Sequence, residues 1–145
     1  MSEDPRTDLE GMPRAEFAFP GPLRDRLVAA ILAGQKTATT SLVVGYELDG
    51  EPMPRVGDRA AVVDSADAVV AVIVTTSVRV VRLADVDLRH AVDEGEGHLS
   101  MQAWRADHEA FWHSQECRAA LGDPEFTVDD DTPVVLERFS LFDPS

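Results

Sequence analysis

One lysine, Lys36, is the first candidate for chemistry in this chain of 145 residues, because all the other basic side chains are arginines. Only an ammonium can lose its proton near neutral pH when its surroundings disfavour the charge. A lysine of lowered pKa can then act as a general base. The alternative is a chance position at the end of a helix, where a cation is favourable.

Hydroxyl side chains follow this lysine in the segment Gly34-Gln35-Lys36-Thr37-Ala38-Thr39-Thr40-Ser41. In an extended segment, Thr37, Thr39 and Ser41 share one face, whereas Lys36 and Thr40 share the other. A turn at the helix exit would bring Lys36 beside Thr39 instead. The functional hypothesis is a lysine base that acts on a neighbouring hydroxyl or on water. The alternative is a threonine-rich edge strand.

A second group of titratable residues is separated by glycines: His90, Asp93, Glu94, Glu96 and His98. His90 and Glu94 are four residues apart and face each other if the helix there persists. The run Glu94-Gly95-Glu96-Gly97 presents two carboxylates on flexible backbone, and general acid catalysis needs one. Metal ligation is conceivable for such groups. A solvated polar loop is the alternative for most of them.

Aromatic residues recur at helical spacing further along, at Trp104, His108 and Trp112. Such a stripe is normally core, with the histidine hydrogen-bonded inside it. A zinc-protease helix would need a second histidine where Trp112 stands, so that motif fails. The single cysteine, Cys117, excludes an internal disulfide and a multi-cysteine zinc site.

The elements that must position these groups follow from hydrophobic periodicity and turn residues. Helices are predicted over 22–33, 84–92 and 100–120, and strands over 59–64, 69–76, 78–83 and 133–142. Residues 37–46 are predicted to be a strand, or a turn that leads into one. Strands and helices that do not alternate strictly indicate an α+β fold, a small mixed β-barrel with helices outside it. Residues 1–13 are predicted to be a flexible arm and residues 14–145 a single domain.

Charge and hydropathy narrow the classes of partner. A net charge of -14 argues against a protein that follows many phosphates, so DNA is not expected as a partner. The longest apolar runs have seven residues, too short to cross a membrane, and no secretory signal is evident. A cytoplasmic location is therefore predicted.

These residues together resemble the ASCH domain of the PUA-like superfamily, whose signature is G-x-K-x-x-T-x-R at a helix-to-strand junction. Gly34, Lys36 and Thr39 match it, and Ser41 stands where the signature has arginine. The resemblance extends from about Leu23 to Phe142 and is to the bacterial single-domain members. It implies a PUA-like barrel of about five to six strands with flanking helices.

The resemblance also implies activities. One small bacterial member removes the acyl group from N4-acetylcytidine with a Lys, a Thr and a Glu, which correspond here to Lys36, Thr39 and Glu94, or to Glu96 if the alignment shifts. Another relative is a ribonuclease, and the family was proposed to bind RNA. The alternatives are therefore cleavage of single-stranded RNA and non-catalytic binding of RNA or a modified base.

The predicted function is amide hydrolysis of an N4-acylated cytidine, because a neutral nucleoside is not repelled by an acidic chain. Lys36 would take a proton from Thr39 or from water, and a carboxylic acid at Glu94 would protonate the leaving amine. No metal and no cofactor are predicted. The oligomeric state stays open. The predicted substrate-binding residues are Gly34, Thr37, Ser41 and Arg79.

Overall fold

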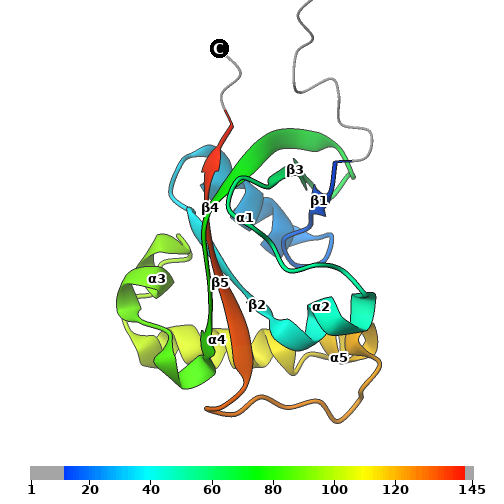
Figure 1. Ribbon diagram of the computed structural model, residues 1–145, viewed down its shortest axis with the longest axis vertical. Helices are drawn as coiled ribbons and strands as arrows, with labels where there is room; N and C mark the ends of the chain where they lie inside the picture. Colours follow the sequence, from blue (N-terminus) through cyan, green and yellow to red (C-terminus); the bar gives the residue numbers. More distant parts are fainter. Residues whose placement is uncertain (1–11, 143–145) are drawn as a thin grey trace, which may run out of the picture.

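A single five-stranded sheet forms the frame of the computed structural model, which describes residues 12–142 (Figure 1). The strand order is β1-β3-β4-β5-β2, with β1 parallel to β3 and the other pairs antiparallel. The strands are β1 (Arg14–Ala15), β2 (Ala38–Leu42), β3 (Arg59–Val63), β4 (Val69–Arg82) and β5 (Pro133–Leu141).

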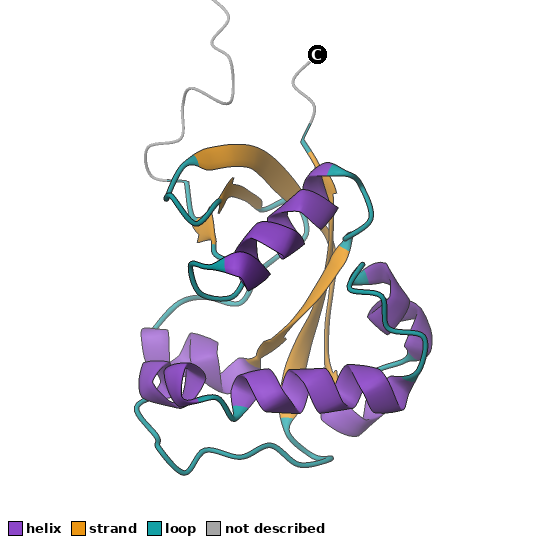
Figure 2. Ribbon diagram, turned by 180° about the vertical axis from the view of Figure 1, so that it is seen from behind, coloured by secondary structure: helices purple, strands orange, loops and turns teal. Residues whose placement is uncertain are grey.

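Helices cover this sheet from more than one side. Figure 2 shows α1 crossing the upper part of the sheet and α4 running across its lower end. The helices are α1 (Pro22–Leu32), α2 (Val43–Asp49), α3 (Leu88–Asp93), α4 (Met101–Trp112) and α5 (Gln115–Leu121), with a 3-10 turn η1 (Leu83–Asp85). Among the described residues, no helix is both long and apolar enough to cross a bilayer.

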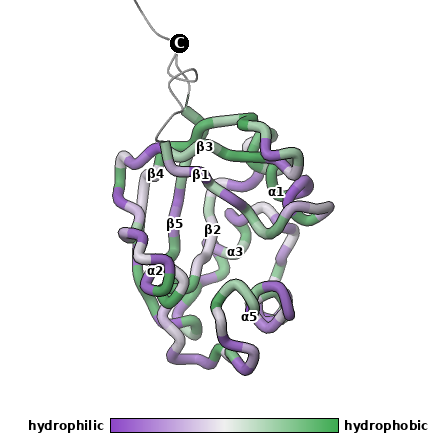
Figure 3. Tube along the Cα trace, turned by 90° about the vertical axis from the view of Figure 1, so that its right-hand side faces the viewer, coloured by the Kyte–Doolittle hydropathy of each residue, from purple (hydrophilic) through white to green (hydrophobic). Residues whose placement is uncertain are grey.

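The hydrophobic core is divided between the two faces of β5. Val134 and Leu136 belong to a cluster around Trp104, whereas Phe139 belongs to a second cluster with Ile31 of α1 and Val62 of β3. Because side chains alternate along a strand, even-numbered residues of β5 face the first cluster and odd-numbered ones the second. The hydropathy colouring of Figure 3 shows the strongly apolar trace of β3 at the second cluster. β5 thus packs against a hydrophobic cluster on each face.

The predicted α+β class is confirmed, and the sheet has five strands. It is open: its edges, β1 and β2, do not pair with each other in the described part of the chain, so closure into a barrel is not observed. With two residues, β1 is too short to bridge the opening. The predicted arm over residues 1–13 lies outside the described residues except for Met12 and Pro13.

The strand predicted over 37–46 is wrong in its second half. It ends at Leu42, and Val43–Asp49 form α2, which ends on Gly50 in the left-handed conformation at φ 65°. Packing overrides the β-propensity of the two valines at the start of this helix. The strands predicted over 69–76 and 78–83 are one strand, β4, with a bulge between Thr75 and Ser77.

The helix predicted over 100–120 is two helices. Its first part, α4, begins with Ser100, whose side chain accepts a hydrogen bond from the backbone of Ala103. After a turn, Ser114 caps α5 in the same manner by accepting from the backbone of Cys117. A second N-cap serine therefore marks the break, as serine caps do at helix starts.

Candidate functional site

The Lys36 side chain is buried at the exit of α1, with 3% of the residue exposed. Its Nζ donates to the carbonyls of Ala38 at 2.8 Å and Glu94 at 3.2 Å, and lies 3.8 Å from Glu96 Oε2. Burial lowers the pKa of Lys36, although the carboxylates of Glu94 and Glu96 pull it upward. The two carbonyls satisfy both N–H groups of a neutral amine and leave its lone pair free.

The loop after α3 approaches Lys36 very closely because of a glycine. Gly95 has φ +71°, and a Cβ there would lie 2.5 Å from the carbonyl oxygen of Gln35. The Thr37 backbone N–H also donates to the Asp93 carbonyl at 2.8 Å. Only glycine combines this conformation with this contact. The glycine thereby sets the distance between the lysine and the two glutamates.

Glu94 is enclosed by hydrogen-bond donors and is 1% exposed. Thr40 donates to its Oε2 at 2.5 Å, His90 Nε2 lies 3.2 Å from the same oxygen, and His108 Nε2 lies 2.9 Å from Oε1. Burial alone would raise the pKa of Glu94. The hydrogen bonds from His108 and His90, with the positive charges of His108 and Lys36, outweigh burial and hold the pKa well below its usual range. Glu94 is therefore a fixed anion.

His108 is the cation that faces this anion. Its Nε2 faces Glu94 and its Nδ1 lies 2.9 Å from the carbonyl oxygen of Trp104. Since both neighbours are acceptors, both ring nitrogens must carry hydrogen, which is the imidazolium form. Burial alone would lower the pKa of His108, but its bond to Glu94 and that carboxylate's charge raise it. The ring stacks on Trp104 with centroids 4.1 Å apart.

Glu96 differs from Glu94 in exposure and in the direction of its pKa shift. Its side chain is 21% exposed, so solvent and small molecules can reach it. Burial raises the pKa of Glu96; the charge of Lys36 opposes this, and the neighbouring Glu94 adds to it. The site thus holds an inner ion pair, Glu94 with His108, and an outer pair, Lys36 with Glu96, that can share one proton.

The structure brings together three of the residues predicted from the sequence, Lys36, Glu94 and Glu96. The Thr39 side chain lies on the face of β2 opposite to Thr40, since the two are consecutive in a strand. It is Thr40 that contacts Glu94. Ser41 shares the face of Thr39.

The other predicted binding residues lie around this group or apart from it. Thr37 contacts the end of α3, where its hydroxyl lies 3.4 Å from the Asp93 carbonyl. Gly34 forms the exposed turn after α1 at φ +77°. Arg79 lies apart, with its half-exposed guanidinium 3.8 Å from Asp87.

From the sequence, neither Thr40 nor His108 is assigned a role in the site, although both contact Glu94. The predicted contact of His90 with Glu94 is confirmed, and so is the burial of Trp104 and Trp112. His108 was assigned to the same core stripe, yet it is an acid-base partner of Glu94. The available signal was a histidine within an aromatic stripe that follows an acidic loop.

Three of these side chains also form a possible metal-ligand set. Glu94, Glu96 and His108 offer ligand atoms that all lie within 4.8 Å of one another. Such carboxylate and imidazole donors suit a divalent transition metal. However, Lys36 Nζ lies 3.8 Å from Glu96 and His108 already faces Glu94 as a cation. The site therefore supplies its own positive charge.

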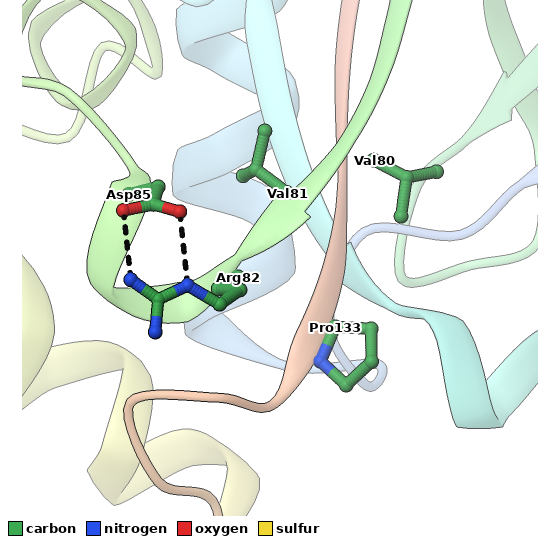
Figure 4. A pocket seen from close by; sticks show the side chains of 5 residues that line it. All are labelled: Val80, Val81, Arg82, Asp85 and Pro133. Atoms are coloured by element: carbon green, nitrogen blue, oxygen red, sulfur yellow. Dashed lines mark hydrogen bonds and ion pairs between the residues drawn. The ribbon is translucent and has the colours of Figure 1, made fainter.

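A surface hollow at the far end of β4 is separate from this site (Figure 4). Its charged residues are already paired, since Arg82 donates to both carboxylate oxygens of Asp85 and also to Asp131. Val80, Val81 and Pro133 complete its lining. It offers no unpaired catalytic group, and we do not assign the chemistry to it.

Comparisons with known proteins show the family of this chain and support its fold. A family model described as the ASCH domain matches residues 16–143. The chain belongs to the ASCH domain family. The crystal structure of an ASCH domain from Lactobacillus crispatus JV V101 is similar to this ASCH domain with a TM-score of 0.76 and 29% identity, over 94% of this chain and 84% of that one.

A second solved structure supports the same fold for this ASCH domain. Protein EF3133 from Enterococcus faecalis V583 is similar with a TM-score of 0.70 and 27% identity, over 81% of this chain and 68% of that one. Comparison with curated proteins gives no match.

The close approach at Gly95 predicts a stability effect. Gly95→Ala should lower the free energy of unfolding by more than about 1 kcal/mol, because a Cβ at positive φ also meets backbone. Gly122→Ala is the matched control, since Gly122 has φ +68° but open space around it. Urea denaturation of both variants measures the difference. Equal losses would show that the contact with Gln35 contributes nothing.

The Glu94–His108 ion pair predicts a pH dependence. Because the folded-state pKa of His108 lies above its unfolded value, its contribution is full below about pH 6.5 and is lost as the pH rises through the folded pKa. His108→Gln should therefore cost about 2 kcal/mol of unfolding free energy at pH 5.5, and less at pH 9. In a Glu94→Gln background this pH dependence should disappear. A cost that does not change with pH would contradict the ion pair.

Proposed function

We propose that this ASCH domain is a hydrolase that cleaves the amide of an N4-acylated cytidine, with Lys36 as general base and Glu96 as general acid. The observation that carries the proposal is the buried Lys36 amine 3.8 Å from the partly exposed carboxyl of Glu96. Burial favours the uncharged form of both groups. A neutral amine and a protonated carboxyl are the forms that a base and an acid need at neutral pH.

The proton transfers balance without any further group. Lys36 takes a proton from water as the water oxygen attacks the amide carbonyl carbon. The bond from that carbon to N4 then breaks as Glu96 gives its proton to the departing amine, leaving a carboxylic acid and cytidine. The lysine is now an ammonium and Glu96 a carboxylate. Return of the proton across the 3.8 Å between them restores the starting state.

The acid is Glu96 rather than Glu94 in this proposal. Glu94 is ionised and receives hydrogen bonds from Thr40 and His108, so it has no proton to give. Its carbonyl instead holds Lys36 in place. The chemistry therefore favours Glu96, the residue that corresponds to the family's glutamate if the alignment shifts.

The charge of the protein supports a small neutral substrate. At a net charge of -14, a single nucleoside meets no repulsion, whereas an RNA strand does. Ribonuclease activity and non-catalytic binding stay as alternatives. Assays of N4-acetylcytidine hydrolysis, cytidine binding and RNA cleavage distinguish the hydrolase from these two alternatives.

The mechanism predicts that Lys36→Arg, which keeps the charge but no titratable amine, lowers kcat for N4-acetylcytidine by a factor of about 100 or more. Glu96→Gln should lower kcat by a similar factor because an amide cannot supply the proton. Liquid chromatography of released cytidine measures both. Arg26→Lys, an exposed change in α1, is the matched control and should leave kcat unchanged.

Three results would contradict the proposal in different ways. Full activity of Lys36→Arg would exclude the lysine base. Binding of cytidine with no hydrolysis by the wild type would indicate a binding module. Cleavage of a single-stranded RNA oligomer that is lost in Lys36→Ala would indicate a ribonuclease.

A further inference from the structure

A second polar cluster lies on the face of the β2–β5 pair that carries Thr39. Its members are five partly or largely buried side chains from four elements, namely Thr39, Ser41, Tyr46, Thr75 and Glu137. We propose that this cluster is the binding subsite for an uncharged pyrimidine nucleoside base, placed beside the Lys36–Glu96 pair. This inference rests on the proposed function for its substrate class.

Strand register puts these residues on one face. Thr39 lies directly opposite Glu137 and Ser41 opposite Val135 in the antiparallel pair. Residues that are directly opposite in such a pair point to the same side of the sheet. The odd-numbered positions of β5 also include Phe139 of the second hydrophobic cluster. Glu137 therefore occupies a position that packing alone would give to an apolar residue.

The bulge in β4 supplies the hydrogen-bond partner of this carboxyl. The register shifts between Thr75 and Ser77, so that Thr75 pairs with Phe139 and Ser77 with Arg138. Bulges re-aim side chains in this manner. The hydroxyl of Thr75, which is 5% exposed, donates to Glu137 Oε2 at 2.7 Å.

The connection before β3 holds the bulge in place. Gly57 N–H donates to the Thr75 carbonyl at 2.8 Å, and Thr75 N–H donates to the Asp58 carbonyl at 2.9 Å. These bonds bring the Asp58 carboxylate near Glu137. Burial raises the pKa of Glu137, the bond from Thr75 opposes this, and the Asp58 charge adds to it. The Glu137 carboxyl can accept a hydrogen bond from a heterocycle, and its protonated form can also donate one.

The phenol of Tyr46 on α2 completes the cluster. Burial raises the pKa of Tyr46, a hydrogen bond with Ser41 opposes this, and the charge of Glu137 adds to it, so the phenol keeps its proton. No member of the cluster is a cation, and the negative charge of Asp58 acts on Glu137. These groups suit a neutral ligand with both donors and acceptors, and they disfavour a phosphate.

The cluster lies on the same side of the sheet as the Lys36 amine. Nζ lies 5.8 Å from the centroid of the Phe17 ring. That ring is 6.0 Å from the ring of Phe139, which shares a face with Glu137 two positions along β5. These two aromatic contacts connect the face that carries Glu137 with the Lys36 amine. This continuity links the cluster to the reacting groups.

The test separates binding from turnover. Calorimetric titration of the full chain with cytidine gives a Kd, and hydrolysis of N4-acetylcytidine gives KM and kcat. Glu137→Ala and Tyr46→Phe should each raise the Kd and the KM about tenfold, the loss expected for one or two hydrogen bonds to the ligand, with a smaller change in kcat. Glu137→Gln should recover part of the affinity. Cytidine 5′-monophosphate should bind at least about tenfold more weakly than cytidine.

Glu125→Gln, an exposed glutamate far along the chain, is the matched control and should change nothing. Ser41→Ala and Tyr46→Phe decide the outcome if Glu137→Ala fails to fold. Normal KM values in these variants, with an active wild type, would overturn the subsite but not the hydrolase. Cytidine binding that these variants weaken, with no hydrolysis by the wild type, would support the subsite and refute the hydrolase. No binding of cytidine by the wild type would overturn the subsite.

Discussion

Burial of the Lys36 amine is the constraint on which the rest of the site depends. An ammonium without water costs several kcal/mol unless it is paired and hydrogen-bonded. Here the Lys36 amine donates hydrogen bonds to two backbone carbonyls, and the Glu96 carboxylate lies farther away at 3.8 Å. The carbonyl of Ala38 is free for this purpose because β2 is an edge strand. Phe139 N–H bonds the Thr37 carbonyl, so in the alternating antiparallel pattern the Ala38 carbonyl points away from β5.

The second carbonyl belongs to Glu94, so the loop after α3 must lie against β2. The inner ion pair connects this loop to His108 of α4. Glu94 and His108 carry opposite charges. Burial lowers the pKa of Lys36 and raises that of Glu96, and the Glu94 carboxylate pulls both upward. The imidazolium is stabilised further by its stacking on Trp104, as expected for a cation over an aromatic face. The protonation of the outer pair is then governed by burial and by the distance of 3.8 Å between its members.

Local residue chemistry was enough to predict part of this arrangement. The isolated lysine and the Glu94-Gly95-Glu96 run stand out in the sequence, and the structure places Lys36 near both glutamates. The sequence does not show whether Thr39 or Thr40 faces Glu94. Consecutive residues of a strand point to opposite faces, and only the pairing of β2 with β5 decides which face is which. Likewise, the burial of Trp104 and Trp112 was predictable from period alone. The partner of His108 was not, because it comes from a different element.

Two further features, the start of α2 and the bulge in β4, depend on tertiary packing rather than on the local sequence pattern. Val43 and Val44 favour a strand, yet they begin a helix where Gly50 permits a left-handed end. The bulge at Thr75 has no clear signal in a run of β-branched residues. It nevertheless determines which threonine hydroxyl reaches Glu137.

Two consecutive charged residues in the middle of β5 show how one strand serves both halves of the site. Glu137 and Arg138 interrupt an apolar strand and point to opposite faces. Arg138 donates to Asp93 at 2.7 Å and so anchors the end of α3 from which Glu94 follows. Glu137 accepts from Thr75 on the other face. An interrupted core strand costs packing energy on both sides of the sheet, and the interruption coincides with the two polar contacts that position the loop and the second cluster.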